Sequence, residues 1–389
     1  MFKNFLLLLS ANLVLAGCAA VSTAQIAPVS DANPQRASDA LRPYYDGLTA
    51  RLPVAPPGAQ LDTDAALTSF AFGSCVNENR AMQFWDVIAA QKPQAFLLIG
   101  DNVYGDTAAT GAADIPTLTA SYRKLNSRQE YARFRSNVPM LTVWDDHDYG
   151  ANDAGATFAF KEYSEKIYEE YWVASDAVKS RPGVYESHMV GPAGKRVQFI
   201  MLDTRFFRSD LARMNYQDPA PKLGWTMPSN DPVATILGGA QWDWLEQELK
   251  RPADLRFIIS SVQVITDAHN FEGWFAFPQE RQKLYRMMVQ SRVNNAVFLT
   301  GDRHSGALYS AQIPGISKPV FEFTSSSLNL SFGKGDTGAR EPDVARIGGL
   351  WSDENFGQID IDWSAKTVKL SLKNAAGNVL EERMIRPMD

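Results

Sequence analysis

The chain has 389 residues, of which 45% are hydrophobic and 21% are charged, and its formal net charge at pH 7 is −6. This composition excludes a disordered or collagen-like chain, and the negative charge provides no basic field to hold a nucleic-acid backbone. Two cysteines cannot form a disulfide framework, and four histidines exclude a histidine-rich metal buffer. At roughly 100–200 residues per domain, the length allows one large domain or two ordinary ones.

The amino-terminal segment has the features of a secretory signal. Lys3 gives a positive start, residues 5–9 and 13–16 are apolar, and a small-residue pair precedes Cys18. The segment is too short to be a stable transmembrane helix. It resembles the lipobox of bacterial lipoproteins, which predicts a signal peptide over residues 1–17 and a lipid attached to Cys18. The alternative is an ordinary signal cut at a nearby Ala-x-Ala site, which would make Cys18 incidental.

These features predict an exported bacterial lipoprotein of the periplasm or outer membrane, bound to a membrane through its lipidated Cys18. Residues 18–60, rich in Ala, Pro, Ser and Gln, are interpreted as a tether with a short helix at 38–52, and residues 61–389 as one domain. Cys75 would then be the only thiol of the mature chain in an oxidising compartment. Metal ligation would explain it, although a cysteine is more often a small buried apolar residue.

Apolar runs of strand length recur along the chain, and each is followed by polar residues. The runs are rich in Ile, Val, Leu and Phe without strict alternation, as expected of strands covered on both faces. They are residues 69–72, 95–99, 140–143, 197–202, 257–264 and 296–300. Helical stretches between them are residues 80–90, 127–135, 158–172, 240–249 and 279–291. The alternation predicts an α/β fold in which helices cover a sheet.

Ligands bind beyond the carboxyl ends of the strands in such sheets, so the side chains that follow these runs are expected to converge. These residues are Cys75, Asp101, Tyr104, Asp146, His147, Asp302 and His304. A single Asp after a strand is more often a turn or a helix cap, but repetition at several strands indicates a site. The mixture of carboxylates with imidazole, thiolate and phenolate suits hard or borderline cations. Two-metal sites, with ions about 3.5–4 Å apart, typically catalyse in-line displacement at phosphorus.

Five short motifs mark these strand ends. They are Phe72-Gly73-Ser74-Cys75, Gly100-Asp101-x-x-Tyr104, Trp144-Asp145-Asp146-His147-Asp148, Leu202-Asp203-Thr204-Arg205 and Gly301-Asp302-Arg303-His304. In this order, over residues 69–310, the chain resembles the metallophosphoesterase superfamily and specifically its PhoD-like alkaline phosphatase D family. The resemblance implies a sheet sandwich flanked by helices in αββα layers. It also implies metal-dependent hydrolysis of phosphate monoesters, diesters or both.

The resemblance further implies a set of ligands for two metal ions. The implied ligands are Cys75, Asp101, Tyr104, Asp146, Asp302 and His304. Cys75, Tyr104 and His304 would bind Fe³⁺, Asp101 would bridge, and the other two aspartates would bind the second ion. Gln263 stands where many relatives have a ligand histidine, which leaves oxygen-rich surroundings that favour Ca²⁺. Mn²⁺ and Zn²⁺ are the alternatives.

The hypothesis for the mechanism is direct attack of a metal-bound hydroxide on phosphorus. His147, in the place of the family's proton donor, would protonate the leaving alkoxide, and Asn152 and Arg205 would lie near the phosphate. Two other readings stay open: a phospholipid-directed phosphodiesterase of the same fold, and a catalytically silent surface lipoprotein that binds a partner. No nucleic acid is expected as a partner, except as a possible substrate.

Two further groups of residues call for ordinary structural interpretations. The aromatic residues of one loop fit a pocket lip and simple packing equally well. They are Phe271, Trp274, Phe275 and Phe277. His188 and His269 are expected to be structural or surface residues.

Overall fold

The computed structural model describes residues 39–44, 51–106, 115–215 and 223–388. The predicted signal peptide and Cys18 lie outside these ranges. Of the helix expected at residues 38–52, residues 39–44 are helical and residues 51 and 52 are not, and the rest lies outside the described ranges. Within the described ranges, no helix is both long enough and apolar enough to cross a membrane.

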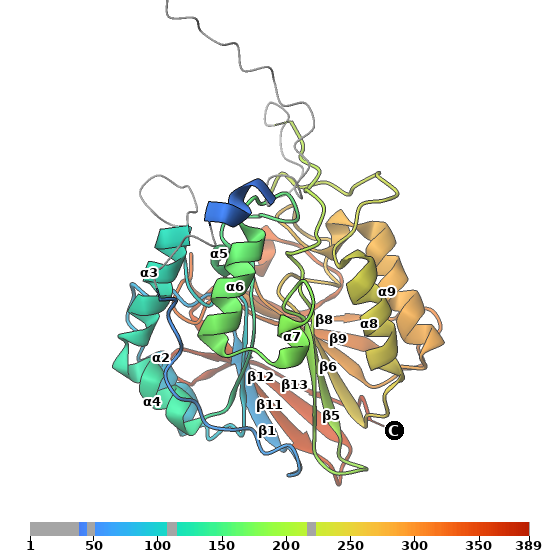
Figure 1. The fold of residues 1–389 in the computed structure, drawn as a ribbon. Coiled ribbons are helices and arrows are strands. Elements are labelled where there is room, and N and C mark those ends of the chain that lie inside the picture. The colour runs from blue at the N-terminus through green and yellow to red at the C-terminus, as the bar shows by residue number, and fades with distance from the viewer. Residues whose placement is uncertain (1–38, 45–50, 107–114, 216–222, 389) are drawn as a thin grey trace, which may run out of the picture.

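Two mixed β-sheets pack against each other at the centre of the molecule (Figure 1). In spatial order, the first sheet consists of β13 (Val379–Ile385), β12 (Thr367–Asn374), β11 (Asn355–Asp362), β1 (Ser69–Gly73), β2 (Phe96–Ile99) and β3 (Met140–Val143). The second sheet consists of β10 (Arg346–Trp351), β8 (Gly306–Ala311), β9 (Val320–Ser325), β7 (Ala296–Thr300), β6 (Leu255–Ser260), β5 (Val197–Met201) and β4 (Glu186–Val190).

Helices cover the outer faces of both sheets. Those beside the first sheet are α2 (Phe84–Ala90), α3 (Ile115–Asn126), α4 (Gln129–Asn137) and α6 (Lys161–Trp172), and those beside the second are α8 (Gly238–Lys250) and α9 (Pro278–Gln290) (Figure 1). Shorter helices are α5 (Asp146–Tyr149), α7 (Asp176–Lys179), η1 (Trp274–Ala276) and η2 (Gly338–Arg340). The αββα sandwich predicted from the sequence is confirmed.

The six predicted apolar runs correspond to β1, β2, β3, β5, β6 and β7. The largest difference in boundaries is at β6, which ends at Ser260 and not at residue 264, so Gln263 lies in the following loop. β9 was not predicted, because it carries Glu322 and Thr324 where a buried strand is expected to be apolar. Both side chains are nonetheless buried.

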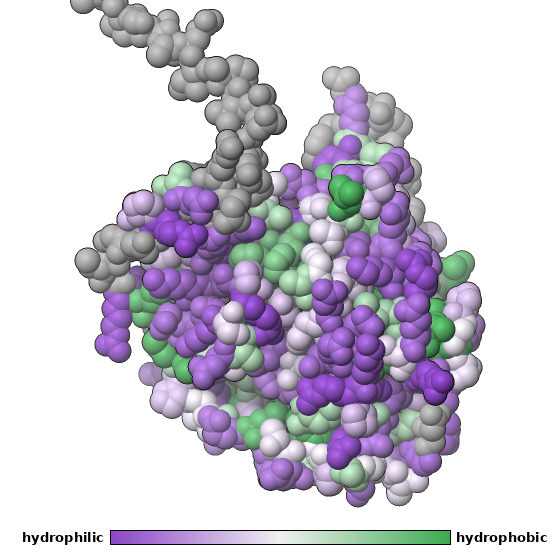
Figure 2. All heavy atoms as spheres, turned by 45° about the vertical axis from the view of Figure 1, so that its right-hand side comes forward, coloured by the Kyte–Doolittle hydropathy of each residue, from purple (hydrophilic) through white to green (hydrophobic). Residues whose placement is uncertain are grey.

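Aromatic side chains form the contact between the two sheets. The Phe70 ring lies edge-on to Phe199 at 5.1 Å and to Phe257 at 4.8 Å between ring centroids. Phe72 meets Phe323 in the same way at 4.9 Å. Each such pair contributes about 0.5–1.5 kcal/mol beyond the area it buries. Apolar side chains are thus concentrated between the layers, and hydrophilic residues cover most of the face drawn in Figure 2.

The strand directions decide where polar loops meet. β1, β2 and β3 run parallel in the first sheet, and β5, β6, β7 and β9 run parallel in the second. Hydrogen bonds join the two sets of carboxyl ends: Ser261 Oγ, after β6, donates to Asp145 Oδ1, after β3, at 2.6 Å. The carboxyl ends of seven strands therefore face one edge of the sandwich, near α5 in Figure 1.

Glu322 of β9 is a fully buried carboxyl group in the second sheet. It accepts hydrogen bonds from the backbone N–H of Ile265 at 2.6 Å and from Thr300 Oγ1 at 2.9 Å. Burial raises the pKa of Glu322 to about 7, although these hydrogen bonds favour the ionised form. In the unfolded chain the group ionises near pH 4.3. Rising pH therefore favours the unfolded chain between about pH 4.3 and 7, by about 4 kcal/mol in total.

We expect the substitution Glu322→Gln to remove this pH dependence, because an amide keeps the acceptor for Ile265 and carries no charge. In urea denaturation, the free energy of unfolding of the variant should equal that of the wild type near pH 4.5 and exceed it by up to about 4 kcal/mol at pH 8. The exposed Glu170→Gln serves as the control and should change neither value. A variant that follows the wild-type pH profile would show that Glu322 is ionised in the folded protein.

Candidate metal centre

Residues that follow four different strands bring metal-binding atoms together at this edge. One atom each from Cys75, Asp101 and His304 lie within 4.8 Å of one another. A second set, within the same limit, consists of three carboxylates: Asp145, Asp146 and Asp302. The first set offers sulfur, nitrogen and oxygen donors, and the second offers oxygen alone. Cys75 and His304, which are 229 positions apart in the numbering (304 − 75), therefore place their donor atoms close enough together to hold one ion.

Asp101 connects the two sets. Its carboxylate also lies within 4.8 Å of Asp146 and His147. On its other side, Asp101 Oδ2 accepts hydrogen bonds from Cys75 Sγ at 3.2 Å and from Tyr104 OH at 3.1 Å. The structure thus brings together all six predicted ligands, with Asp101 between the mixed set and the carboxylate set. Its bridging role stays a prediction that this position favours.

The tautomer of His304 is fixed by a hydrogen bond. Nδ1 lies 2.5 Å from the carbonyl oxygen of Leu330, which can only accept, so Nδ1 carries the proton. Nε2 is then left with its lone pair, 3.4 Å from Tyr104 OH. Burial lowers the pKa of His304 to about 4, so the ring is neutral at pH 7. A neutral imidazole whose other nitrogen donates to a carbonyl is the usual form of a histidine ligand.

Four predicted ligands have left-handed backbone conformations. Their φ angles are 62° at Cys75, 49° at Asp101, 66° at Asp302 and 49° at His304. Non-glycine residues pay roughly 1–2 kcal/mol each for this conformation, and such residues cluster at functional sites. The turn directs each side chain inward as the chain leaves the strand. Hydrogen bonds hold these turns, such as that from the His304 N–H to Ser326 Oγ at 2.9 Å.

Negative charge is concentrated in this cluster. Asp101, Asp145 and Asp146 are each at most 2% exposed, and Asp302 is partly buried. Burial raises the pKa of Asp101 well above its usual range, an effect that His147 opposes and that the neighbouring aspartates increase. Asp145 Oδ2 is buried without a hydrogen-bond partner among the described residues. Buried carboxylates need compensating charge, so this donor set fits two cations.

Arg205 provides part of that compensation. Its fully buried guanidinium contacts Asp145 and Glu272 and lies 3.8 Å from Asp146 Oδ1. Its Nη1 is buried without a hydrogen-bond partner in the described part of the chain. The contacts observed are therefore with carboxylates, and the predicted contact with a phosphate stays a prediction. Glu272, which the sequence analysis missed, lies in the loop after β6 and carries no local feature that separates it from a surface glutamate.

His147 stands beside the cluster in a fixed orientation. Its Nδ1 lies 2.5 Å from Asp106 Oδ1, and its backbone N–H donates to Asp146 Oδ1 at 3.0 Å. Burial alone would lower the pKa of His147, but Asp146, Asp101 and Asp106 raise it to about 11. The sequence analysis missed Asp106, although a second carboxylate five positions after Asp101 (106 − 101) could have indicated it. With Nδ1 held, Nε2 is the nitrogen available to a ligand or substrate.

Two other residues considered from the sequence have simpler surroundings. Asn152 is exposed in the loop after α5, where the N–H of the next residue, Asp153, donates to Asp146 Oδ2 at 2.8 Å. Its predicted contact with phosphate stays a prediction. The Gln263 amide is engaged at both ends, with His269 Nε2 at 2.9 Å and Thr324 Oγ1 at 2.8 Å. His269 is fully buried, as expected of a structural histidine.

The aromatic residues of the loop after β6 were expected to form a pocket lip or to pack in the interior, and they differ in exposure. Trp274, Phe275 and Phe277 are buried, so packing describes them and a pocket lip does not. Phe271 is 42% exposed, and the guanidinium carbon of Arg303 lies 4.7 Å from its ring centroid.

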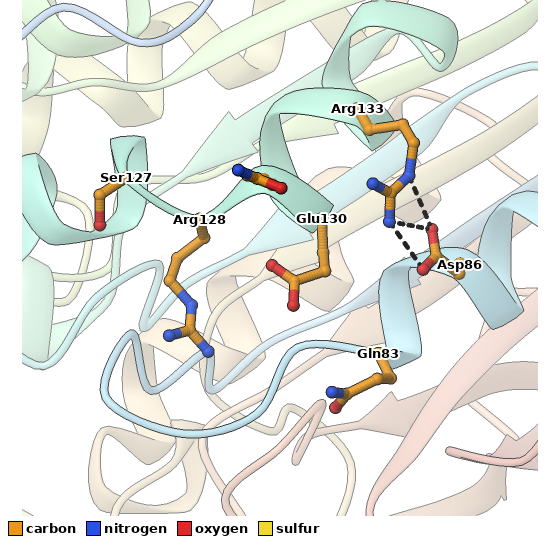
Figure 3. A pocket seen from close by; sticks show the side chains of 7 residues that line it. Gln83, Asp86, Ser127, Arg128, Glu130 and Arg133 are labelled. Atoms are coloured by element: carbon orange, nitrogen blue, oxygen red, sulfur yellow. Dashed lines mark hydrogen bonds and ion pairs between the residues drawn. The ribbon is translucent and has the colours of Figure 1, made fainter.

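A separate hollow of about 500 Å³ lies between α2 and α4 (Figure 3). Its main feature is an ion pair in which Arg133 holds both carboxylate oxygens of Asp86 at 2.8–2.9 Å. Both side chains are more than half exposed, and the pair already satisfies their charges. None of the predicted ligands lines this hollow, which therefore adds nothing to the metal centre.

Comparison with known proteins shows the family and the fold of the chain. Residues 70–372 match the family model described as PhoD-like phosphatase. The chain belongs to this family. Alkaline phosphatase D of Bacillus subtilis (strain 168) is 25% identical over 333 residues, which cover 72% of this chain and 51% of that protein. The chain thus spans about half the length of this PhoD-like relative.

A solved structure titled "Structure of PhoD" supports the fold. It superposes with a TM-score of 0.63 at 19% sequence identity, covering 86% of this chain and 70% of that one. The resemblance inferred from the five motifs is confirmed at the level of the PhoD-like family and its fold.

We expect Asp302→Asn to have opposite effects on the metal-free and metal-loaded protein. Without ions, the variant should be more stable by about 1 kcal/mol, because one of four crowded carboxylates has lost its charge. Ions at a hundred times their Kd should stabilise the wild type by about 2.7 kcal/mol per site, and the variant by less. Thermal denaturation after chelation and after re-addition of metal measures both. The exposed Asp64→Asn controls for the substitution; equal behaviour of both variants would exclude Asp302 from the centre.

Proposed function

We propose that the chain is a dinuclear metal-dependent hydrolase of phosphate esters, acting on monoesters, diesters or both. The observation that carries the proposal is the junction of a mixed donor set and an all-carboxylate set at Asp101 and Asp146, with His147 beside it. Family membership supports the same reaction class. The His147–Asp106 pair argues against a silent binding protein, because a purely structural metal site needs no oriented imidazole.

The two donor sets favour different metals. Cys75, Tyr104 and His304 combine a thiol, a phenol and an imidazole, which suits Fe³⁺, whereas the carboxylates around Asp146 suit Ca²⁺. Bound there, the two cations would neutralise charge on the phosphoryl oxygens and lower the pKa of a water molecule. Elemental analysis of the purified protein should find iron and calcium in equal amounts; Mn²⁺ or Zn²⁺ in their place would overturn this assignment.

His147 supplies the proton in this proposal. Asp106 holds Nδ1, so Nε2 faces the leaving oxygen and transfers its proton as the ester bond to phosphorus breaks. Arg205 fixes the position of Asp145, and its unpaired Nη1 supports a contact with a phosphoryl oxygen.

Export and anchoring are proposed on the sequence features of residues 1–18. A lipid on Cys18 would anchor the mature chain to a membrane, either in the periplasm or at the outer membrane. Cell fractionation tests this directly: the wild type should sediment with membranes, and Cys18→Ser should not. Sedimentation of both would contradict lipid anchoring at this residue.

We expect His147→Ala to slow alkyl esters far more than aryl esters. Loss of a general acid typically costs 10²–10⁴-fold, but a nitrophenolate leaves without needing a proton. Steady-state assays of ethyl phosphate against p-nitrophenyl phosphate, and of the corresponding diesters, measure the difference. Asp106→Asn should shift the same ratio to a lesser degree, since it removes the charge that orients His147. Equal losses on alkyl and aryl esters in both variants would exclude His147 as the acid.

A further inference from the structure

Phe332 is a largely exposed aromatic residue placed against a metal ligand. It lies in the loop after β9, its side chain is 77% exposed, and its ring centroid is 4.4 Å from that of His304. The two rings are tilted by 48°. One side of Phe332 therefore packs against the imidazole, while most of its surface is open to solvent. Leaving such a ring in water forgoes roughly 25 cal/mol for each Å² that could be buried.

Hydrogen bonds hold the loop at residues on both sides of Phe332 in the sequence. Before it, the carbonyl oxygen of Leu330 accepts the 2.5 Å hydrogen bond from His304 Nδ1. Asn329 binds the neighbouring loop, accepting from the Asn77 N–H at 2.7 Å. After it, the N–H of Gly335 donates to Asp353 Oδ2 at 2.7 Å. The exposed ring is therefore presented in a fixed position relative to the metal centre, and binding to it would require little ordering of the chain.

Phe271, a second exposed aromatic residue among those described, offers less free surface. Phe271 packs against Arg303, the residue next to His304, and lies 5.9 Å from the ring of His269. Arg303 is itself held by an ion pair with buried Glu341 at 2.6 Å. Phe271 thus lies against Arg303 with its ring covered in part, whereas Phe332 lies against His304 with its ring largely free.

We propose that Phe332 is a specificity-determining residue that binds an aromatic group of the ester while the phosphoryl group lies at the metal centre. This rests on the proposed function and names the class of substrate: phosphate esters that carry a planar aromatic group. A fixed, flat ring favours such a group over an aliphatic chain, because aromatic pairs contribute about 0.5–1.5 kcal/mol beyond buried area. Phe332 takes no part in proton transfer or metal ligation, so its contribution is to selection.

Benzyl phosphate and ethyl phosphate test the proposal, because both have alkyl leaving groups and only one carries a ring. We expect Phe332→Ala to lower kcat/KM about tenfold for benzyl phosphate and by less than twofold for ethyl phosphate. Phe332→Leu, which keeps apolar bulk without the ring, should fall between. If the enzyme prefers diesters, the methyl diesters of the two esters replace them.

Met384→Ala is the matched control for truncating an exposed apolar side chain. Met384 is 55% exposed near the end of β13, and the antiparallel steps from β1 through β11 and β12 place that end at the opposite edge of the sheet. The Met384→Ala variant should have the same kcat/KM as the wild type for benzyl phosphate and for ethyl phosphate. Inhibition by inorganic phosphate should be the same in every variant. Inhibition by phenylphosphonate should weaken only in the two variants at Phe332.

The outcomes separate this inference from the function on which it rests. A metal-loaded wild type that hydrolyses no phosphate ester overturns both. If the wild type is active, two results overturn the role of Phe332 alone: the Phe332→Ala variant loses activity equally on benzyl and ethyl phosphate, or it loses activity on neither. Weaker binding of Phe332→Ala to phospholipid vesicles, with unchanged preference for benzyl phosphate, would instead make the ring a membrane contact and would also overturn the proposal.

Discussion

The concentration of four aspartates at one edge of the sandwich is the constraint around which the structure is arranged. Three of them are buried, and the guanidinium of Arg205 compensates only part of their charge. Such a cluster is unfavourable in a folded protein unless cations complete it. The parallel strand directions in both sheets bring the carboxylates together, and the folded state therefore carries an electrostatic cost that bound cations would relieve.

Around that cluster, different parts of the chain have different tasks. Asp101 and Asp146 belong to more than one donor set, so a substitution at either residue alters two donor sets at once. His147 is oriented from outside by Asp106, and the loop of Phe332 is attached through Leu330 to His304. Under the proposed function, proton transfer and recognition of the organic group would each depend on one contact with the centre, and neither would require a change in the ligands themselves.

The sequence predicted the parts of this arrangement that depend on local pattern. Apolar runs such as residues 296–300 are strands because both of their faces are buried, and a polar residue directly after one must lie at the sheet edge, as Asp302 does. Contacts between distant loops had no local signal. Glu272 meets Arg205 only because two loops converge, and β9 was missed because Glu322 is buried by neighbours that the sequence does not place beside it.

The left-handed backbone at Cys75, Asp101, Asp302 and His304 has an evolutionary consequence. Glycine adopts that conformation without strain, so at each of these positions the substitution that relaxes the backbone also deletes a donor atom. Selection for a more stable fold therefore favours glycine at these four positions, whereas selection for catalytic activity favours the side chain that carries the donor atom. In relatives that no longer need catalytic activity, glycine is therefore expected to appear early at these positions.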